Sequence, residues 1–201
     1  MRKSMINKVK NWRILLPLAR LVPSSLTKGR TFLLKAMSKN SICAEIGTYN
    51  GNFARKILYF TNPQKLHLID PWVDSWHDGA AYQDKMNNRY QNVLKRFNRE
   101  INLGKVAIHR GYSHEVCNNF EDNYFDWIYI DGNHQYEFVK KDLELYYPKI
   151  KMGGFITGDD YYGKGHWWQD DVKKAVDEFI ATKLVKLIMI KNGQFLLEKV
   201  R

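Results

Sequence analysis

The segment from Phe125 to Asp160 carries the residues best suited to chemistry. An apolar, aromatic run ends in Asp131, His134 follows three residues later, and the next apolar run ends in Asp159 and Asp160. If the two runs are neighbouring strands of a parallel sheet, the three carboxylates meet in one crevice at its carboxyl edge. Such carboxylates repel one another and need a counter-charge, which Mg²⁺ or another divalent cation could supply. His134 would lie beside the cation, and the ordinary pKa of histidine suits a general base. The alternative is that Asp131 and Asp159 cap helices and that the other two residues are solvated.

A second constellation lies nearer the N-terminus. Glu45, Gly47 and Gly51 span a turn between an apolar run and a helical segment, and Asp70 ends the next apolar run. Glycines in such a turn let the backbone approach a ligand, and the first N–H groups of the helix point at it. The spacing G-x-x-x-G behind an acid differs from the pyrophosphate-binding G-x-G-x-x-G, while an acid at a strand tip can accept hydrogen bonds from both ribose hydroxyls. We interpret the two features as a nucleoside site for a ligand with a cationic amino acid end; the alternative is turn chemistry, with Asp70 as a cap before Pro71.

The elements that position these residues follow from periodicity. From Ser41 onward, short runs rich in β-branched and aromatic residues alternate with helical segments, as in the βαβ units of a parallel sheet. Strands are predicted at Ile42 to Gly47, Lys65 to Asp70, Lys105 to Gly111, Phe125 to Asp131, Gly154 to Asp159, Leu184 to Ile190 and Gln194 to Val200. Helices are predicted near Asn52 to Phe60, Ala80 to Asn98, Ser113 to Phe120, Tyr136 to Ile150 and Trp168 to Thr182. In the helix at Tyr136, an apolar stripe is expected from Phe138, Leu143, Leu145 and Tyr146.

The last two predicted strands are joined only by Asn192 and Gly193. This dipeptide suits the positive φ angles of a tight hairpin, so the last strand must run antiparallel to its predecessor. The predicted fold class is therefore α/β, a doubly wound, Rossmann-like, seven-stranded sheet that is mostly parallel and has an antiparallel C-terminal strand.

Residues 1–40 are predicted to form an N-terminal helical extension that packs on the core or covers the site. They carry a set of large apolar residues, namely Trp12, Ile14, Leu15, Leu18, Leu21, Phe32, Leu33 and Leu34. Residues 41–201 are assigned to one ligand-binding domain, because no repeat or linker divides them.

Composition restricts the function classes less than the motifs do. The net charge of +11, from 32 basic and 21 acidic residues, suits nucleic acid, an anionic membrane or an acidic substrate, but the basic residues are spread along the chain as on a solvated surface. Cys43 and Cys117 show neither metal-ligand nor redox spacing, which predicts reduced thiols. Pro17 and Arg20 interrupt the apolar run at residues 14–22, so no signal peptide or transmembrane segment is expected. We expect a cytoplasmic protein, and association of identical chains stays open.

Four sequence segments match a known family. The strongest match, from Phe125 to Tyr161, is FDWIYIDGNHQYEFVKKDLELYYPKIKMGGFITGDDY, and AEIGTYNG, LHLIDPW and DDVKKAVDEF support it. From Ala44 to the C-terminus, the chain resembles class I S-adenosylmethionine-dependent methyltransferases. Within them it is similar to the small-molecule O-methyltransferase group that includes macrolide-sugar and catechol-type enzymes.

The resemblance implies a role for each matching residue around S-adenosylmethionine. Glu45, Gly47 and Gly51 would shape the methionine pocket, Asp70 would hold the ribose, and Ser113 would lie near the adenine. The full set of predicted cofactor-binding residues is Glu45, Gly47, Thr48, Tyr49, Gly51, Asp70, Pro71, Trp72, Ser113 and Asp131.

The resemblance also implies a metal site. Asp131, Asp159 and Asp160 match the metal ligands of the macrolide-sugar enzymes, and His134 matches their proposed base, so His134 and Asp131 are the predicted catalytic residues. The catechol-type set ends in Asn where this chain has Asp160, which favours the sugar-type comparison.

The predicted function is metal-assisted O-methylation of a small molecule such as a sugar. Five aromatic residues could line the pocket for the acceptor, although each could equally be a core residue or anchor a loop. They are Trp72, Trp76, Tyr161, Trp167 and Trp168. One alternative is RNA methylation, which the charge favours, although the fourth strand tip lacks an Asn-Pro-Pro-Tyr-like motif. Another is a metal-dependent hydroxylase or hydrolase on the same sheet, which would not need Glu45 and Asp70.

Overall fold

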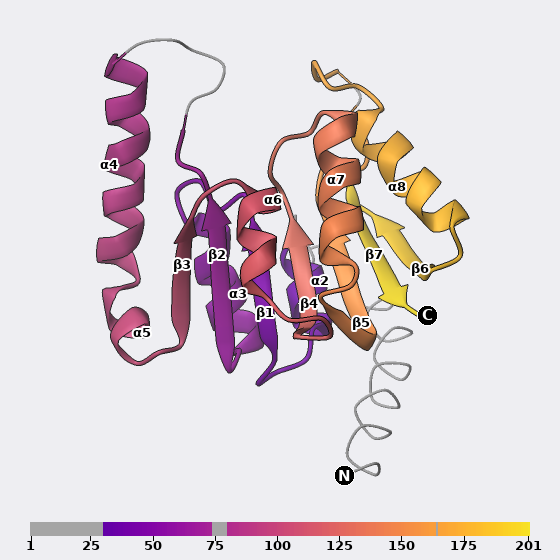
Figure 1. Ribbon diagram of the computed structural model, residues 1–201, viewed down its shortest axis with the longest axis horizontal. Coiled ribbons are helices and arrows are strands. Elements are labelled where there is room, and N and C mark those ends of the chain that lie inside the picture. The colour runs from indigo at the N-terminus through magenta and orange to yellow at the C-terminus, as the bar shows by residue number, and fades with distance from the viewer. Residues whose placement is uncertain (1–29, 74–79, 164) are drawn as a thin grey trace.

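The computed structural model describes residues 30–73, 80–163 and 165–201, which form a seven-stranded sheet (Figure 1). The strands lie in the order β3-β2-β1-β4-β5-β7-β6. Their bounds are β1 Ile42–Ile46, β2 Lys65–Asp70, β3 Val106–Arg110, β4 Phe125–Ile130, β5 Ile150–Gly158, β6 Val185–Lys191 and β7 Gln194–Lys199. Strands β1 to β5 pair in parallel, and β7 runs antiparallel between β5 and β6. The predicted α/β class, with one antiparallel C-terminal strand, is confirmed.

Helices cover both faces of this sheet. They are α2 Thr31–Ala36, α3 Asn52–Thr61, α4 Ala80–Arg96, α5 Asn98–Asn102, α6 Ser113–Val116, the short 3₁₀ helix η2 Cys117–Asn119, α7 Tyr136–Tyr146 and α8 Asp171–Ala181. Figure 1 shows α6 and α7 in front of the sheet and α2 and α3 behind it. Each face has its own apolar core, and the central strand β4 supplies both: Ile128 and Ile130 pack with α7 and α8, whereas Trp127 and Tyr129 pack with α2 and α3. Alternation along a strand therefore explains why this run is apolar throughout.

The predicted boundary between α7 and β5 was wrong. The helix ends at Tyr146 instead of Ile150, and the strand begins at Ile150, four residues before the predicted Gly154. Pro148 explains the difference, because a proline has no amide N–H with which to continue the helical hydrogen bonds. The other predicted helices are found with ends shifted by a few residues.

The predicted apolar stripe of α7 was also partly wrong. Phe138 is 43% exposed, and the buried face consists of Val139, Asp142, Leu143 and Tyr146. This spacing follows one face of a 3.6-residue helix, onto which Phe138 does not fall. The buried Asp142 in that face belongs to the site described below.

The C-terminal hairpin was predicted correctly. Asn192 and Gly193 have φ angles of 53° and 75°, as the two central residues of a tight hairpin turn require. What the dipeptide could not indicate is that β7 inserts between β5 and β6, so that Thr157 of β5 faces Leu196 in the ladder.

Only residues 30–40 of the predicted N-terminal extension fall within the described part of the chain. Its short helix α2 buries Phe32, Leu33 and Leu34 in the core behind the sheet, whereas Trp12, Ile14, Leu15, Leu18 and Leu21 lie outside the described residues. Among the helices that the structure describes, none has the length and apolar character needed to cross a membrane. The cytoplasmic location stays a prediction. Cys43 and Cys117 are buried, unpaired thiols.

A buried histidine of β2 carries a prediction about stability. Nδ1 of His67 lies 2.9 Å from Nε2 of His109, and Nε2 of His67 lies 3.1 Å from the Tyr124 hydroxyl. Burial, together with the neighbouring His109, lowers the pKa of His67 to about 3. In the unfolded chain it titrates near 6.5. The unfolded state therefore binds more protons between these two values, and the contribution of His67 to stability is lost as the pH falls below about 6.5.

We expect the free energy of unfolding to fall by about 3 kcal/mol between pH 7 and pH 4 on account of His67. Urea unfolding of the native chain and of His67→Phe at both pH values measures it, because Phe occupies a similar volume and does not titrate. The quantity to compare is the loss of stability between pH 7 and pH 4 in the native chain and in the variant. The comparison is needed because burial raises the pKa of Glu45 and Asp142, which makes both proteins more stable as the pH falls. Equal losses of stability in both proteins would contradict the assignment.

Candidate active site

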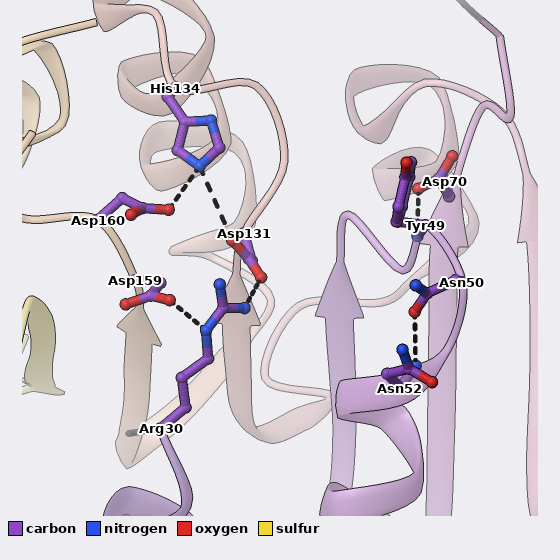
Figure 2. A network of polar contacts seen from close by, with 9 residues as sticks. All are labelled: Arg30, Tyr49, Asn50, Asn52, Asp70, Asp131, His134, Asp159 and Asp160. Atoms are coloured by element: carbon purple, nitrogen blue, oxygen red, sulfur yellow. Dashed lines mark hydrogen bonds and ion pairs between the residues drawn. The ribbon is translucent and has the colours of Figure 1, made fainter. Parts of the chain in front are cut away.

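Most of the predicted site residues lie where β1, β2, β4 and β5 end, with Asp131, His134, Asp159 and Asp160 in one group and Asp70 apart from them (Figure 2). Ile46 pairs with both Ile69 and Ile130, and Ile130 pairs with Gly158, so the four strands end at one level. The residues that follow or complete them, Gly47, Asp70, Asp131 and Asp159, are therefore brought to the same edge. This gathering is what the parallel arrangement predicted.

Gly47 is required by close contact between two loops. Its φ angle is +90°, and a Cβ atom there would lie 2.1 Å from the carbonyl oxygen of Asp131. Its amide donates to the carbonyl of Ile69, while the amide of Asp131 donates to the carbonyl of Ile46. The turn after β1 is thus packed directly against the turn after β4. Gly51, with φ +71°, caps α3 and leaves room for the ring of Phe97.

Asp70 joins the loops after β1 and β2. Its Oδ2 accepts a 2.7 Å hydrogen bond from the amide of Tyr49, and its Oδ1 accepts one of 2.7 Å from the amide of Trp72. Burial raises the pKa of this carboxyl group. The Trp72 side chain, fully buried, donates from Nε1 to the carbonyl of Tyr49, and the half-buried Pro71 lies between. Each carboxylate oxygen keeps a second lone pair, so Asp70 can still accept hydrogen bonds from a ligand.

Glu45 is a buried acid that lacks a full set of partners. Its side chain is 1% exposed, and within the described residues neither its Oε2 nor the Oγ1 of the adjacent Thr48 has a hydrogen-bond partner. Burial first, and then the charge of Asp131, raise its pKa well above the usual range. Such a carboxyl group is unfavourable unless a cation or a donor joins it. The orphaned oxygen therefore fits the cationic amino acid end of S-adenosylmethionine.

Ser113 opens α6, after β3, as predicted. Its hydroxyl donates to Oδ1 of Asp142 at 2.5 Å, and its carbonyl accepts from the Tyr146 hydroxyl at 3.0 Å. Burial raises the pKa of Asp142 to about 7. Sequence reasoning did not select Asp142, because a lone acid within a helix belongs to no motif.

The acid cluster is neutralised by two side chains. Figure 2 shows the Arg30 guanidinium between Asp131 and Asp159, to which its Nη1 and Nε are ion-paired. Nε2 of His134 lies 2.8 Å from Oδ2 of Asp160 and 3.8 Å from Oδ1 of Asp131. Burial opposes the charge on His134, but these carboxylates outweigh it and raise its pKa to about 9. His134 is therefore an imidazolium at neutral pH, which explains how the three carboxylates can lie together.

Asp159 and Asp160, which follow β5, have pKa values that are shifted in opposite directions. Burial raises the pKa of Asp159 to about 6 although Arg30 opposes this, whereas the hydrogen bond from His134 lowers the pKa of Asp160. Burial also opposes the charge of Arg30, but Asp131, Tyr129 and Asp159 outweigh it and raise its pKa. Arg30 stays charged at any pH at which the chain is folded.

The structure groups the candidate metal ligands differently from the prediction. Ligand atoms of Asp131, His134 and Asp160 lie within 4.8 Å of one another, and Asp159 is held by Arg30 instead. Two carboxylates and an imidazole are a donor set that a divalent cation can use. The site thus brings together two of the three predicted ligands and adds His134, which was predicted as a base.

Arg30 is a second residue that sequence reasoning missed. It lies 101 positions before Asp131, in a chain with 32 basic residues, and no motif marks it. The only signal was indirect: a cluster of three carboxylates demands a counter-charge, which was assigned to a metal alone.

The aromatic candidates for the acceptor pocket separate into two classes. Trp72 and Tyr161 are buried; Trp72 anchors a loop, and the Tyr161 hydroxyl donates to Asp177 at 2.6 Å. Trp168 stacks on His134 with 4.4 Å between ring centroids, and Trp167 is 58% exposed. Trp76 lies outside the described residues. Trp168 is therefore the candidate that contacts the acid cluster, and Trp167 packs edge-on against Trp168 with 5.4 Å between ring centroids.

Comparison with known proteins identifies the family of the chain. Residues 44–161 match the model of a family described as "Methyltransferase domain". An uncharacterized protein of Acanthamoeba polyphaga mimivirus is 41% identical over 141 residues, which are 68% of this chain and 58% of that protein. The chain thus spans less than two thirds of the length of this relative.

Solved structures show the same fold at low sequence identity. A proposed caffeoyl-CoA O-methyltransferase from Staphylococcus aureus is 19% identical, with 98% of each chain covered and a TM-score of 0.63. A proposed methyltransferase from Streptococcus mutans, in complex with S-adenosylhomocysteine, is 16% identical, with 89% of this chain and 98% of the other covered and a TM-score of 0.57.

Proposed function

This chain belongs to the methyltransferase domain family, and from that premise we propose that it transfers the methyl group of S-adenosylmethionine to a hydroxyl group of a small molecule, such as a sugar, with the help of a divalent cation. Membership of this family supports the predicted enzyme class, an S-adenosylmethionine-dependent methyltransferase. The O-methylation, the class of acceptor and the metal are the proposal.

The observation that carries the cofactor assignment is the orphaned Oε2 of the buried Glu45, in the strand that pairs with the one ending in Asp70. Glu45 would neutralise the ammonium group of the cofactor, and Asp70 would accept hydrogen bonds from its ribose hydroxyls. Bound there, S-adenosylmethionine supplies an electrophilic methyl group on a sulfonium ion. The contribution of the chain is then mainly to hold this methyl in line with the acceptor oxygen.

The acid cluster would serve the acceptor. Asp131, His134 and Asp160 would hold the divalent cation, which would supply Lewis acidity for the acceptor hydroxyl. His134 can act as a ligand or as a proton acceptor only as a neutral imidazole. Because Asp131 and Asp160 raise its pKa to about 9, any partner that takes up their charge lowers that pKa and makes His134 available.

Calorimetric titration with S-adenosylhomocysteine tests the proposed function. We expect the native chain to bind it with a micromolar dissociation constant at pH 7.5, because a buried carboxylate gains a cationic partner. If no heat of binding is found, with or without Mg²⁺, the methyl-transfer proposal fails.

Nucleic acid is a second candidate acceptor, and one surface favours it. A groove of about 650 Å³ lies between α3 and α5, and its lining includes Arg55, Arg96, Arg99 and Lys105 beside Tyr59, which is 81% exposed. Cationic side chains beside an exposed aromatic ring suit a single-stranded nucleic acid. Tight RNA binding with a steep salt dependence that Arg55→Gln and Arg99→Gln reduce would favour this candidate over a sugar.

The hydroxylase or hydrolase alternative has less support. It would use the carboxylates after β4 and β5 but leave Glu45 and Asp70 without a ligand. Methyl transfer uses both groups of residues.

A further inference from the structure

Arg30 supplies a positive charge to the acid cluster. Its Nη1 is ion-paired with Oδ2 of Asp131, and its Nε with Oδ2 of Asp159, so one guanidinium bridges the ends of β4 and β5. The carboxylate side chains of Asp131 and Asp159 are 14% and 11% exposed, whereas the Arg30 side chain is 36% exposed, so the acids are largely buried and the arginine is partly open to solvent. Guanidinium groups suit such bridging because their N–H donors are fixed in one plane.

The fold holds Arg30 in this position. It immediately precedes α2, whose residues Phe32, Leu33 and Leu34 are buried in the core behind the sheet. The guanidinium also lies 5.7 Å from the ring centroid of Phe53, in the first turn of α3. The backbone of Arg30 is thus anchored by apolar packing, and only its side chain would need to rotate for the ion pairs to break.

Asp131 belongs to both the ion pair and the candidate metal group. Its Oδ2 is taken by Arg30, and its Oδ1 faces Nε2 of His134 at 3.8 Å. A divalent cation among Asp131, His134 and Asp160 would compete for the charge of Asp131 and would meet a fixed positive charge next to it. Both effects weaken binding of the metal while Arg30 is in place.

We propose that Arg30 is the resident cation of this site and that it competes with a divalent metal ion for Asp131, so that Arg30 sets the metal affinity of the enzyme. The inference rests on the proposed function only in that the metal assists the transfer of the methyl group. It makes the metal exchangeable instead of permanently bound: the ion occupies the cluster when the Arg30 side chain turns away, and Arg30 neutralises Asp131 and Asp159 when the ion leaves.

Titration with Mn²⁺, followed by the electron paramagnetic resonance signal of the unbound ion, tests this on the full chain at pH 7.5. Removing the guanidinium charge in Arg30→Gln is expected to tighten Mn²⁺ binding at least tenfold, because Asp131 becomes available and the repulsion disappears. Lys35→Gln removes one positive charge from α2, the helix that directly follows Arg30, and it is expected to change the affinity less than twofold. Adding Asp160→Asn to Arg30→Gln should abolish the gain, which locates the ion.

Equal or weaker binding in Arg30→Gln, or a gain that Lys35→Gln reproduces, would overturn the proposal. Titration of the same variants with S-adenosylhomocysteine keeps two failures apart. If the native chain and Arg30→Gln bind S-adenosylhomocysteine but not Mn²⁺, the role of Arg30 toward a metal is wrong and the methyltransferase assignment stands. If Mn²⁺ binding tightens as expected but S-adenosylhomocysteine does not bind, the role of Arg30 stands and the proposed function fails.

Discussion

Asp70→Ala is expected to weaken the binding of S-adenosylhomocysteine by about 100-fold or more. Two hydrogen bonds from ribose hydroxyls to a carboxylate together contribute about 3 kcal/mol, which corresponds to that factor. The variant also loses the two backbone hydrogen bonds that hold Tyr49 and Trp72, so the loops after β1 and β2 lose their common anchor. Calorimetric titration of the native chain and the variant measures the effect.

A matched control is available at the opposite end of the sheet. Asp126, near the start of β4, also uses its carboxylate to accept a 2.7 Å hydrogen bond from a backbone amide, that of Ile42, and it is ion-paired with Lys151. Asp126→Ala therefore removes a comparable structural contact far from the predicted ribose. We expect it to leave the affinity for S-adenosylhomocysteine unchanged. If both variants weaken binding equally, the effect of Asp70 is general loss of stability and the ribose assignment is wrong.

Among substitutions that add one methyl group in the site, Gly47→Ala is expected to reduce the stability of the protein the most. The new Cβ would lie 2.1 Å from the carbonyl oxygen of Asp131 and 2.7 Å from Cα of Gly132, both backbone atoms, so the two loops must separate. The φ angle of +90° adds strain for any residue with a side chain. We expect a loss of about 4 kcal/mol in the free energy of unfolding, together with loss of cofactor binding.

Gly104→Ala separates the two causes. Gly104 also has a positive φ, +70°, but a Cβ there would meet no atom within 4 Å. Its substitution should cost only the backbone strain, about 1 kcal/mol. Urea unfolding of both variants gives the comparison. Equal losses of stability would show that strain alone matters at Gly47 and that the contact with Asp131 can relax.

The sequence by itself determined the order of the elements and most residues of the proposed cofactor site. Alternating apolar runs and helical segments located all seven strands, and the turn at Asn192 and Gly193 established the direction of the last one. Glu45, Gly47 and Asp70 could be selected because their types and their places at strand ends are properties of short segments. A parallel sheet then brings these strand ends together without further information. Errors of the same local kind, such as the end of α7 before Pro148, come from signals present in the sequence but overlooked.

Tertiary structure alone decided what neutralises the acids and where the edge strands lie. Arg30 reaches Asp131 because α2 packs against the sheet next to α3, although 101 residues separate the two side chains along the chain. The contact between His67, His109 and Tyr124 and the insertion of β7 between β5 and β6 likewise join segments that no local pattern relates. Periodicity and turn chemistry act over a few residues, whereas an ion pair between distant residues depends on how whole elements pack. For this reason the carboxylates could be predicted, and the arginine that neutralises two of them could not.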